Sequence, residues 1–266
     1  MRRATLALAP FVLVALLLGA WEGLCRGLQV PDYFLPRPSE VALALVERWP
    51  LLLEAALRTL VYALSALALA SAAALSLAIG AALSRTFESA VRPIAVTLQV
   101  TPVVAIAPLA VIWAGLDHAD RAVIGLAAVV AFFPIFSGAV RGLNAEDPDL
   151  ARLFQLYGAS RLQTLWRLKL PSAVPFLLEG HRVAIGLAVI GAVVAEFVAG
   201  SGQTQGLAWR ILEAQNRLRI ADMLAAVLIL GVLAVALNLS FAWLEHLIMR
   251  SRPVSGGLRG GRIHSA

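Results

Sequence analysis

The sequence predicts an all-α membrane protein with about six transmembrane helices, and composition is the first reason. The 266-residue chain is 60% apolar and 14% charged, whereas soluble domains are about 45–50% apolar and about 25% charged. Its 16 acidic and 22 basic residues are too few to form the surface of a soluble protein of this size. These figures exclude a soluble enzyme and a disordered regulator. The lone Cys25 excludes a disulfide-rich secreted domain.

Six apolar stretches are the second reason. A helix needs about 20 mostly apolar residues to cross a bilayer, because its backbone polar groups must pair within the segment. The stretches that meet this requirement are residues 4–24, 60–83, 95–116, 122–140, 183–200 and 223–244. The first could instead be a cleaved signal peptide. Its apolar run is longer than a typical signal core, and Leu18-Gly19-Ala20 lacks a small-x-small cleavage site, so we expect an uncleaved anchor.

The distribution of lysine and arginine predicts the orientation. With the N-terminus inside, the inner segments hold 14 basic residues and the outer segments hold 8. Because basic residues are enriched in cytoplasmic loops, both termini are expected to lie in the cytoplasm. The net charge of +6 then reflects membrane topology, and no nucleic-acid partner is expected. Residues 251–266, beyond the last span, are expected to form a disordered tail.

Two outer segments are expected to contain short helices. Ser39 is a candidate N-cap for a helix that runs through Trp49. In residues 201–222, apolar side chains recur at helical spacing on one face, namely Leu207, Ile211, Ala214 and Leu218. This second helix is expected to cover the mouth of the bundle.

A few residues within the spans are candidates for a translocation path or gate. Glu196 lies in the fifth span, where an ionisable side chain is costly and suggests function. Its place near the outer end also allows simple contact with water or a neighbouring helix. Gln99 and Thr101 lie in the third span, beside a proline at position 102 that is expected to bend the helix.

The pair Gly191 and Ala195 in the fifth span has the small-xxx-small spacing that allows two helices to approach closely. Both core packing and a dimer axis are consistent with this pattern, and the sequence leaves the choice open.

The cytoplasmic segment 141–182 is expected to fold into two short amphipathic helices. Asp147-Pro148-Asp149 favours a helix start, with proline in the first turn and acidic residues at the positive end of the helix dipole. Gly158 ends that helix, and Ala159-Ser160 opens a second one, which Pro171 and Pro175 are expected to interrupt. The pair suits either the lipid headgroup surface or a cytoplasmic protein partner.

This segment resembles a pattern in the inner-membrane permease subunits of ABC importers, EAA-x3-G-x9-I-x-LP. Gly158 is followed by nine residues and then by Leu168-Lys169-Leu170-Pro171, with leucine in place of isoleucine. The EAA triplet is missing, because Arg152-Leu153-Phe154 stand in its place. The flanking sequence YGASRLQTLWRLKLPSAVPFLLEGHRVAIGLAVIGAVVAEFVAG is similar to the nitrate/sulfonate/taurine (NitT/TauT) branch, as are LPRPS after the first span and TPVVAIAPLAVIWAGL in the third. That branch includes permeases for thiamine-pyrimidine precursors and riboflavin.

The resemblance implies a type I ABC importer permease fold in a bacterial inner membrane, with a cytoplasmic coupling-helix pair. It implies four kinds of partner: cytoplasmic ATP-binding subunits, a periplasmic or external solute-binding protein, a second copy of the permease, and membrane lipid. By this resemblance the residues that contact the ATPase are Leu153, Phe154, Tyr157, Gly158, Ala159, Ser160, Leu168, Leu170 and Pro171. The solute stays open, because in such importers the binding protein sets most of the selectivity.

The sequence also predicts that ATP is used by a partner and not by this chain. A P-loop requires G-x4-G-K-[ST], and the only lysine, Lys169, follows Leu168. No metal or other cofactor is expected to bind this chain, and no H-E-x-x-H motif indicates a hydrolase. The alternative is a self-contained secondary transporter driven by an ion gradient. Such transporters usually pair inverted repeats around buried charges, and no repeat stands out here.

Overall fold

The computed structural model describes residues 2–115, 118–199 and 205–250, which form helices and the turns between them. The helices are α1 (Arg2–Gly27), α2 (Pro38–Glu47), α3 (Trp49–Leu83), α4 (Arg85–Val100), α5 (Val103–Ala114), α6 (Ala119–Leu143), α7 (Pro148–Leu156), α8 (Arg161–Thr164), the π-helical turn η2 (Leu165–Lys169), α9 (Leu170–Ala199), α10 (Leu207–Asn216) and α11 (Ile220–Arg250). Within α1 the side chains of residues 2–9 and 11 lie outside the described part. The expected tail, residues 251–266, also lies outside it.

Four helices of the described part are long and apolar enough to cross a membrane, and a bent pair would make a fifth. The four are α3, α6, the continuous run Arg161–Ala199 and α11. They contain the described residues of the predicted spans 60–83, 122–140, 183–200 and 223–244. The predicted span 4–24 falls in α1, where several side chains are outside the description. The all-α membrane fold is therefore confirmed, with four or five candidate spans among the described residues.

The predicted third span, 95–116, is not one continuous helix. Its described residues belong to α4 and α5, whose axes differ by 101°. Pro102 is the cause, because its ring disfavours helical backbone at the preceding residue. Thr101 accordingly takes an extended conformation, with φ −69° and ψ 124°, and ends α4. The apolar sequence on both sides of this break conceals it from a reading based on hydropathy.

The run from Arg161 to Ala199 is also longer than predicted. Pro171 and Pro175 were expected to interrupt it, and that expectation is wrong, because one helical run of 39 residues passes through both. Pro171 is the second residue of α9, which follows directly after the turn η2. The preceding turn η2 is widened, and the N–H of Leu170 bonds to the carbonyl of Leu165 five residues back. The widened turn lets the helix continue toward the first proline.

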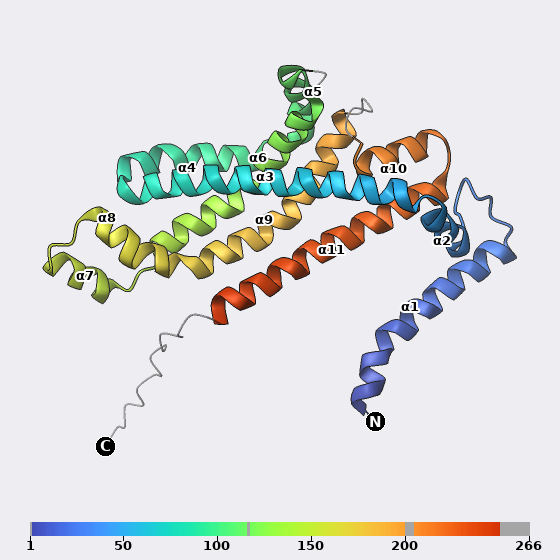
Figure 1. Cartoon of the computed structure of the whole chain (residues 1–266), viewed down its shortest axis with the longest axis horizontal. Coiled ribbons are helices and arrows are strands. Elements are labelled where there is room, and N and C mark those ends of the chain that lie inside the picture. The colour runs from blue at the N-terminus through green and yellow to red at the C-terminus, as the bar shows by residue number, and fades with distance from the viewer. Residues whose placement is uncertain (1, 116–117, 200–204, 251–266) are drawn as a thin grey trace.

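The core lies where α6 and α9 pack along α3, and small residues let their backbones approach (Figure 1). A Cβ added to Gly191 would lie 2.9 Å from Cα of Ala127 in α6. Ala195, one turn further along α9, is fully buried. Of the two readings of this pair, core packing against α6 is the one observed.

We expect Gly138→Ala to lower the free energy of unfolding by about 1–3 kcal/mol, because overpacking a close helix contact forces the backbones apart. The new Cβ would lie 2.7 Å from the carbonyl oxygen of Phe176 and 3.3 Å from Cα of Gly180 in α9. Gly125→Ala in the same helix is the control, because nothing lies within 4 Å of its Cβ position. Thermal unfolding in detergent measures both variants. Equal midpoints would contradict the close contact.

The two ends of the bundle are built differently. The short helices α7 and α8 lie beyond one end of α3, and α2 and α10 lie at the other (Figure 1). Ser39 was expected to cap α2, but the N-cap is Arg37. The Ser39 hydroxyl instead donates to Glu22 of α1 at 2.9 Å. Ser39 therefore joins α1 to α2, a long-range contact that local helix rules do not reveal.

Candidate functional site

A groove runs along the face shared by α4, α6 and α9. It consists of two cavities of about 330 and 310 Å³ that have four lining residues in common, Gln99, Phe133, Pro134 and Leu187. The first cavity extends to Thr101 and Val103 at the break between α4 and α5. The second extends to Ser137, Arg141 and Glu179. The structure thus brings the predicted residues Gln99 and Thr101 to one groove.

The break between α4 and α5 fixes the position of Gln99 and Thr101. The Thr101 hydroxyl donates to the carbonyl of Thr97 at 2.7 Å, and the Thr97 hydroxyl donates to the carbonyl of Pro93 at 2.9 Å. The Thr97 carbonyl also accepts from the backbone N–H of Thr101 at 3.1 Å, so the last turn of α4 is held by backbone and side-chain bonds together. The last turn of α4 therefore holds its form, and Gln99 lies in that turn at the groove.

The chemistry of the groove is mainly apolar with a few polar groups, as in many sites for small molecules. Gln99 and Thr101 offer neutral hydrogen-bonding groups. Arg141 of α6 and Glu179 of α9 are exposed and supply charges of opposite sign at the other end. The groove can therefore hold a small solute that has both polar and apolar parts.

The sequence interpretation missed Glu179, although a signal was present. Glu179, Val183 and Leu187 are spaced four residues apart, so they lie on one face of α9, and all three line the groove. Ser137 and Arg141 of α6 have the same spacing and face α9 across the groove. The pattern that indicates such a residue is an ionisable side chain spaced four and eight residues from apolar side chains on the same helix face.

Glu196 does not line this groove. Its side chain is fully buried, and its carboxylate accepts a hydrogen bond from the backbone N–H of Gly206. The N–H groups of Ala208 and Trp209 also interact with this carboxylate. The next amide, of Leu207, donates to the hydroxyl of buried Thr59 in α3 at 2.9 Å. The predicted path residue is thus found at the N-terminus of α10, whose first N–H groups lack partners within the helix.

Gly206 is required by this arrangement. A Cβ at this position would lie 2.5–2.6 Å from the two carboxylate oxygens of Glu196 and 2.7 Å from Oγ1 of Thr59. Only glycine lets the backbone approach both groups. The helix predicted within residues 201–222 is confirmed as α10, and Leu207, Ile211 and Ala214 are buried on one face of it. Leu218 is not on its buried face, because α10 ends before it and its side chain is 69% exposed.

The second candidate surface, called here the coupling surface, comprises α7, the Gly158 turn and α8. Asp147 caps α7 by accepting from the N–H of Asp149 at 2.8 Å. Ser160 caps α8, and its hydroxyl accepts from Gln163 N–H at 3.2 Å while Gln163 returns a bond to the Ser160 N–H. Gly158 between them has φ +66°, a left-handed conformation that favours glycine. The local sequence rules therefore located both helices and their turn.

Apolar side chains project from the coupling surface. Leu153 is 44% exposed, and Tyr157 is 83% exposed. Phe154 and Ala159 are half-buried, and Ser160 and Pro171 are exposed. Leu168 is buried and Leu170 half-buried, so these two pack toward the bundle instead. Three further apolar residues here, Leu156, Leu162 and Trp166, are exposed but do not belong to the predicted contact set.

The coupling surface is fastened to the bundle at its base. Arg161 donates to the carbonyl of Leu83 at the C-terminus of α3, where a positive charge is favourable. Lys169 pairs with Glu146 at 3.1 Å, and both side chains are largely buried. This ion pair joins the two ends of the segment that contains α7 and α8. The helices that carry the exposed apolar side chains are therefore bonded to the helix bundle at both ends of the segment.

Comparison with known proteins identifies the family. Residues 70–252 match the model of the family described as "Binding-protein-dependent transport system inner membrane component". A probable ABC transporter permease protein of Haemophilus influenzae is 32% identical over 239 residues, which cover 90% of this chain and 96% of the relative. The formylaminopyrimidine transport permease protein ThiX of Halalkalibacterium halodurans is 30% identical over 250 residues, covering 94% and 98%. The taurine transport system permease protein TauC of Escherichia coli is 31% identical over 163 residues, covering 61% and 58%.

A family of inner-membrane components is consistent with the long apolar helices of this chain. The chain therefore belongs to the family of binding-protein-dependent transport system inner membrane components, as an ABC transporter permease of the nitrate/sulfonate/taurine branch.

Proposed function

We propose that this chain forms the translocation path of an ABC importer in a bacterial inner membrane, with both termini in the cytoplasm. Two copies assemble around the path, and separate cytoplasmic subunits bind and hydrolyse ATP. An external binding protein delivers the solute. The chain itself performs no hydrolysis and binds no cofactor.

The coupling surface is the observation that supports this proposal. Leu153, Leu156 and Tyr157 project from α7 with 44%, 84% and 83% of their surface exposed. An amphipathic helix of this kind can insert its apolar side chains into a groove of a partner protein. The fastened base and the short turn at Gly158 give the surface the stiffness needed to transmit force. We infer that Leu153, Phe154, Tyr157, Gly158, Ala159 and Ser160 meet the ATPase, while Leu168, Leu170 and Pro171 fix the base.

The solute class follows from the groove and from the relatives. The relatives' names include transport of formylaminopyrimidine, riboflavin, taurine and nitrate, and all four are small polar solutes. The Gln99 end of the groove offers neutral hydrogen bonds, and its Arg141–Glu179 end offers both signs of charge. We infer a small polar solute of the kind that these relatives carry. Glu196 takes no part in the path.

Reconstitution in proteoliposomes tests the proposal. The chain is purified together with candidate ATPase subunits, and uptake is followed with the binding protein outside and ATP inside. Uptake is expected to require both components. If no P-loop protein binds, and uptake continues under a proton gradient without ATP, the chain is a secondary transporter instead.

We expect Leu187→Trp to reduce the maximal uptake rate about tenfold, because pore width limits the passage of solute. Leu187 lines both cavities, so an indole ring there fills the middle of the groove. Ile190→Trp is the matched control, since Ile190 lies in the same helix, is 57% exposed and does not line the groove. Uptake of radiolabelled solute at saturating concentration measures both. Equal rates for the two variants would remove the groove from the path.

A further inference from the structure

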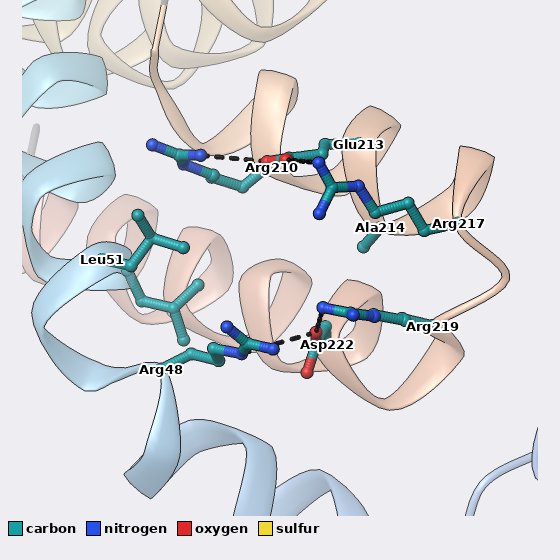
Figure 2. Close-up of a pocket in the computed structure, with 9 residues that line it drawn as sticks. Arg48, Leu51, Arg210, Glu213, Ala214, Arg217, Arg219 and Asp222 are labelled. Carbon is teal, nitrogen blue, oxygen red and sulfur yellow. Dashed lines mark hydrogen bonds and ion pairs between the residues drawn. The ribbon is translucent and has the colours of Figure 1, made fainter.

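Four arginine side chains surround a small cavity at the end of the bundle opposite the coupling surface (Figure 2). The cavity has a volume of about 80 Å³ and lies where α10 and the starts of α3 and α11 meet. Its charged lining consists of Arg48, Arg210, Arg217, Arg219, Glu213 and Asp222. We call these six residues the arginine cluster. None of them belongs to the groove or to the coupling surface.

The arginine cluster has more positive charge than its carboxylates neutralise. Glu213 pairs with both Arg210 and Arg217 at 2.9 Å. Asp222 pairs with Arg48 at 3.7 Å and with Arg219 at 3.9 Å (Figure 2). Each carboxylate therefore serves two guanidinium groups, which leaves the six residues with a net charge of +2. Asp32 lines an adjoining cavity with Arg48, Arg219 and Asp222, so the surroundings remain positive by one charge when it is included. A guanidinium has five N–H donors, so several donors stay available to a further anionic group.

One of these arginines is largely enclosed. The Arg210 side chain is 17% exposed, and its Nε is buried with no hydrogen-bond acceptor among the described residues. Arg48, Arg217 and Arg219 are 43%, 59% and 50% exposed. The cluster thus has a fixed inner cation and an accessible outer rim. A group approaching from outside the protein meets the rim first.

The position of the arginine cluster connects it to the rest of the bundle. Arg210 and Glu213 belong to α10, whose N-terminus is held by Glu196 of α9 and Thr59 of α3. The helical run that contains Glu196 begins at Arg161, in the coupling surface. One continuous helical run therefore extends from the coupling surface to the base of α10. A partner that contacts the arginine cluster therefore contacts α10, which is bonded to the helical run Arg161–Ala199 through Glu196.

We propose that the arginine cluster receives an acidic side chain of the solute-binding protein when that protein docks. This inference rests on the proposed function, which supplies the binding protein and the outward orientation of α10. A carboxylate matches the spare guanidinium donors in charge and in its planar, two-oxygen geometry. A cavity of about 80 Å³ suits the end of one side chain. It adjoins a wider and more open cavity of about 480 Å³ at Arg48, Arg219 and Asp222, through which a side chain can approach from outside.

A docked protein is a better occupant than a free anion. Three of the four arginines are well exposed, and an ion pair in water contributes little because solvent screens it. A carboxylate carried by a docking protein is held in place by the rest of the interface, so its effective concentration at the cavity is high. Docking also removes water from the rim, which strengthens the attraction.

The double variant Arg217→Gln/Arg219→Gln tests this surface in the assembled transporter. The dissociation constant of the fluorescently labelled binding protein is measured on nanodiscs over a range of salt concentrations. We expect that constant to rise about tenfold at low salt and its dependence on salt to weaken, because rim charges set attraction and encounter. Arg26→Gln is the matched control. Arg26 is 62% exposed and pairs with Glu22 four residues before it, as Arg217, 59% exposed, pairs with Glu213.

The outcomes separate this inference from the proposed function. If the wild-type transporter neither binds nor needs a binding protein, the proposed function fails. If binding occurs but the double variant binds as tightly as Arg26→Gln, the docking surface is wrong. The double variant could also lose uptake while the dissociation constant of the binding protein stays unchanged. If inorganic phosphate or anionic lipid in the nanodisc then changes the uptake rate, the cluster binds a free or lipid anion and the docking proposal is wrong. Arg217→Gln alone, checked for an unchanged melting temperature, keeps the test valid if the double variant does not fold.

Discussion

Replacing Glu196 with alanine is expected to destabilise the protein by about 3 kcal/mol and to release α10 from the bundle. The Glu196 carboxylate accepts from the N–H of Gly206 and interacts with the N–H groups of Ala208 and Trp209. Alanine would leave the buried N–H of Gly206 without its acceptor, which costs about 1–3 kcal/mol, and would remove the carboxylate near the first N–H groups of α10. Thermal unfolding and uptake both measure the effect.

Two controls isolate the role of the carboxylate. Glu196→Gln keeps an oxygen that can accept from Gly206, so its loss of stability is expected to be smaller than that of the alanine variant. Glu179→Ala removes an exposed carboxylate from the same helix and is expected to leave the melting temperature unchanged. If Glu196→Ala had the same melting temperature as the wild-type protein but lost uptake, Glu196 would act on the solute and not on α10.

Much of the fold could be predicted from the sequence, because the bilayer imposes simple requirements on length and polarity. The long spans in α3, α6 and α11 follow from uninterrupted apolar sequence. The ends of α7 and α8 follow from residues that act within one turn of the backbone, namely Asp147, Gly158 and Ser160. In each case the cause and the consequence lie close together in the chain.

The predictions that were wrong concern residues whose structural partners lie far away in the sequence. The sequence indicates that a buried Glu196 is energetically costly. Its structural role is to hold the N-terminus of α10 together with Thr59, which accepts from the N–H of Leu207, 148 positions away. Ser39 was assigned to a local cap and instead bonds to Glu22, 17 residues away. Pro102 and Pro175 are both prolines in apolar sequence, yet only the first ends a helix. Packing against neighbouring helices decides such cases, and one sequence does not show it.

Gly158→Val is expected to abolish ATP-driven uptake, while membrane insertion and the pairing of two copies that we propose remain intact. Gly158 has φ +66°, and a β-branched residue is strongly disfavoured in this region of backbone space. Nothing lies within 4 Å of its Cβ position, so the cost comes from the backbone alone. The turn also closes α7, because Gly158 N–H bonds to Gln155 and Ala159 N–H bonds to Phe154, at 3.0 and 2.9 Å. Relieving the strain would break these bonds and move Tyr157 away from its place on the coupling surface.

Gly158→Asn separates this explanation from a simple intolerance of side chains. Asparagine adopts left-handed backbone far more readily than valine, so the turn and the coupling surface are expected to persist and uptake to stay near the wild-type rate. The ATPase subunits should co-purify with the asparagine variant and be lost from the valine variant. Wild-type uptake by Gly158→Val would remove the turn from energy coupling. Equal loss in both variants would instead mean that the partner occupies the open space above Gly158, and that contact with the glycine, more than the turn it permits, joins the two proteins.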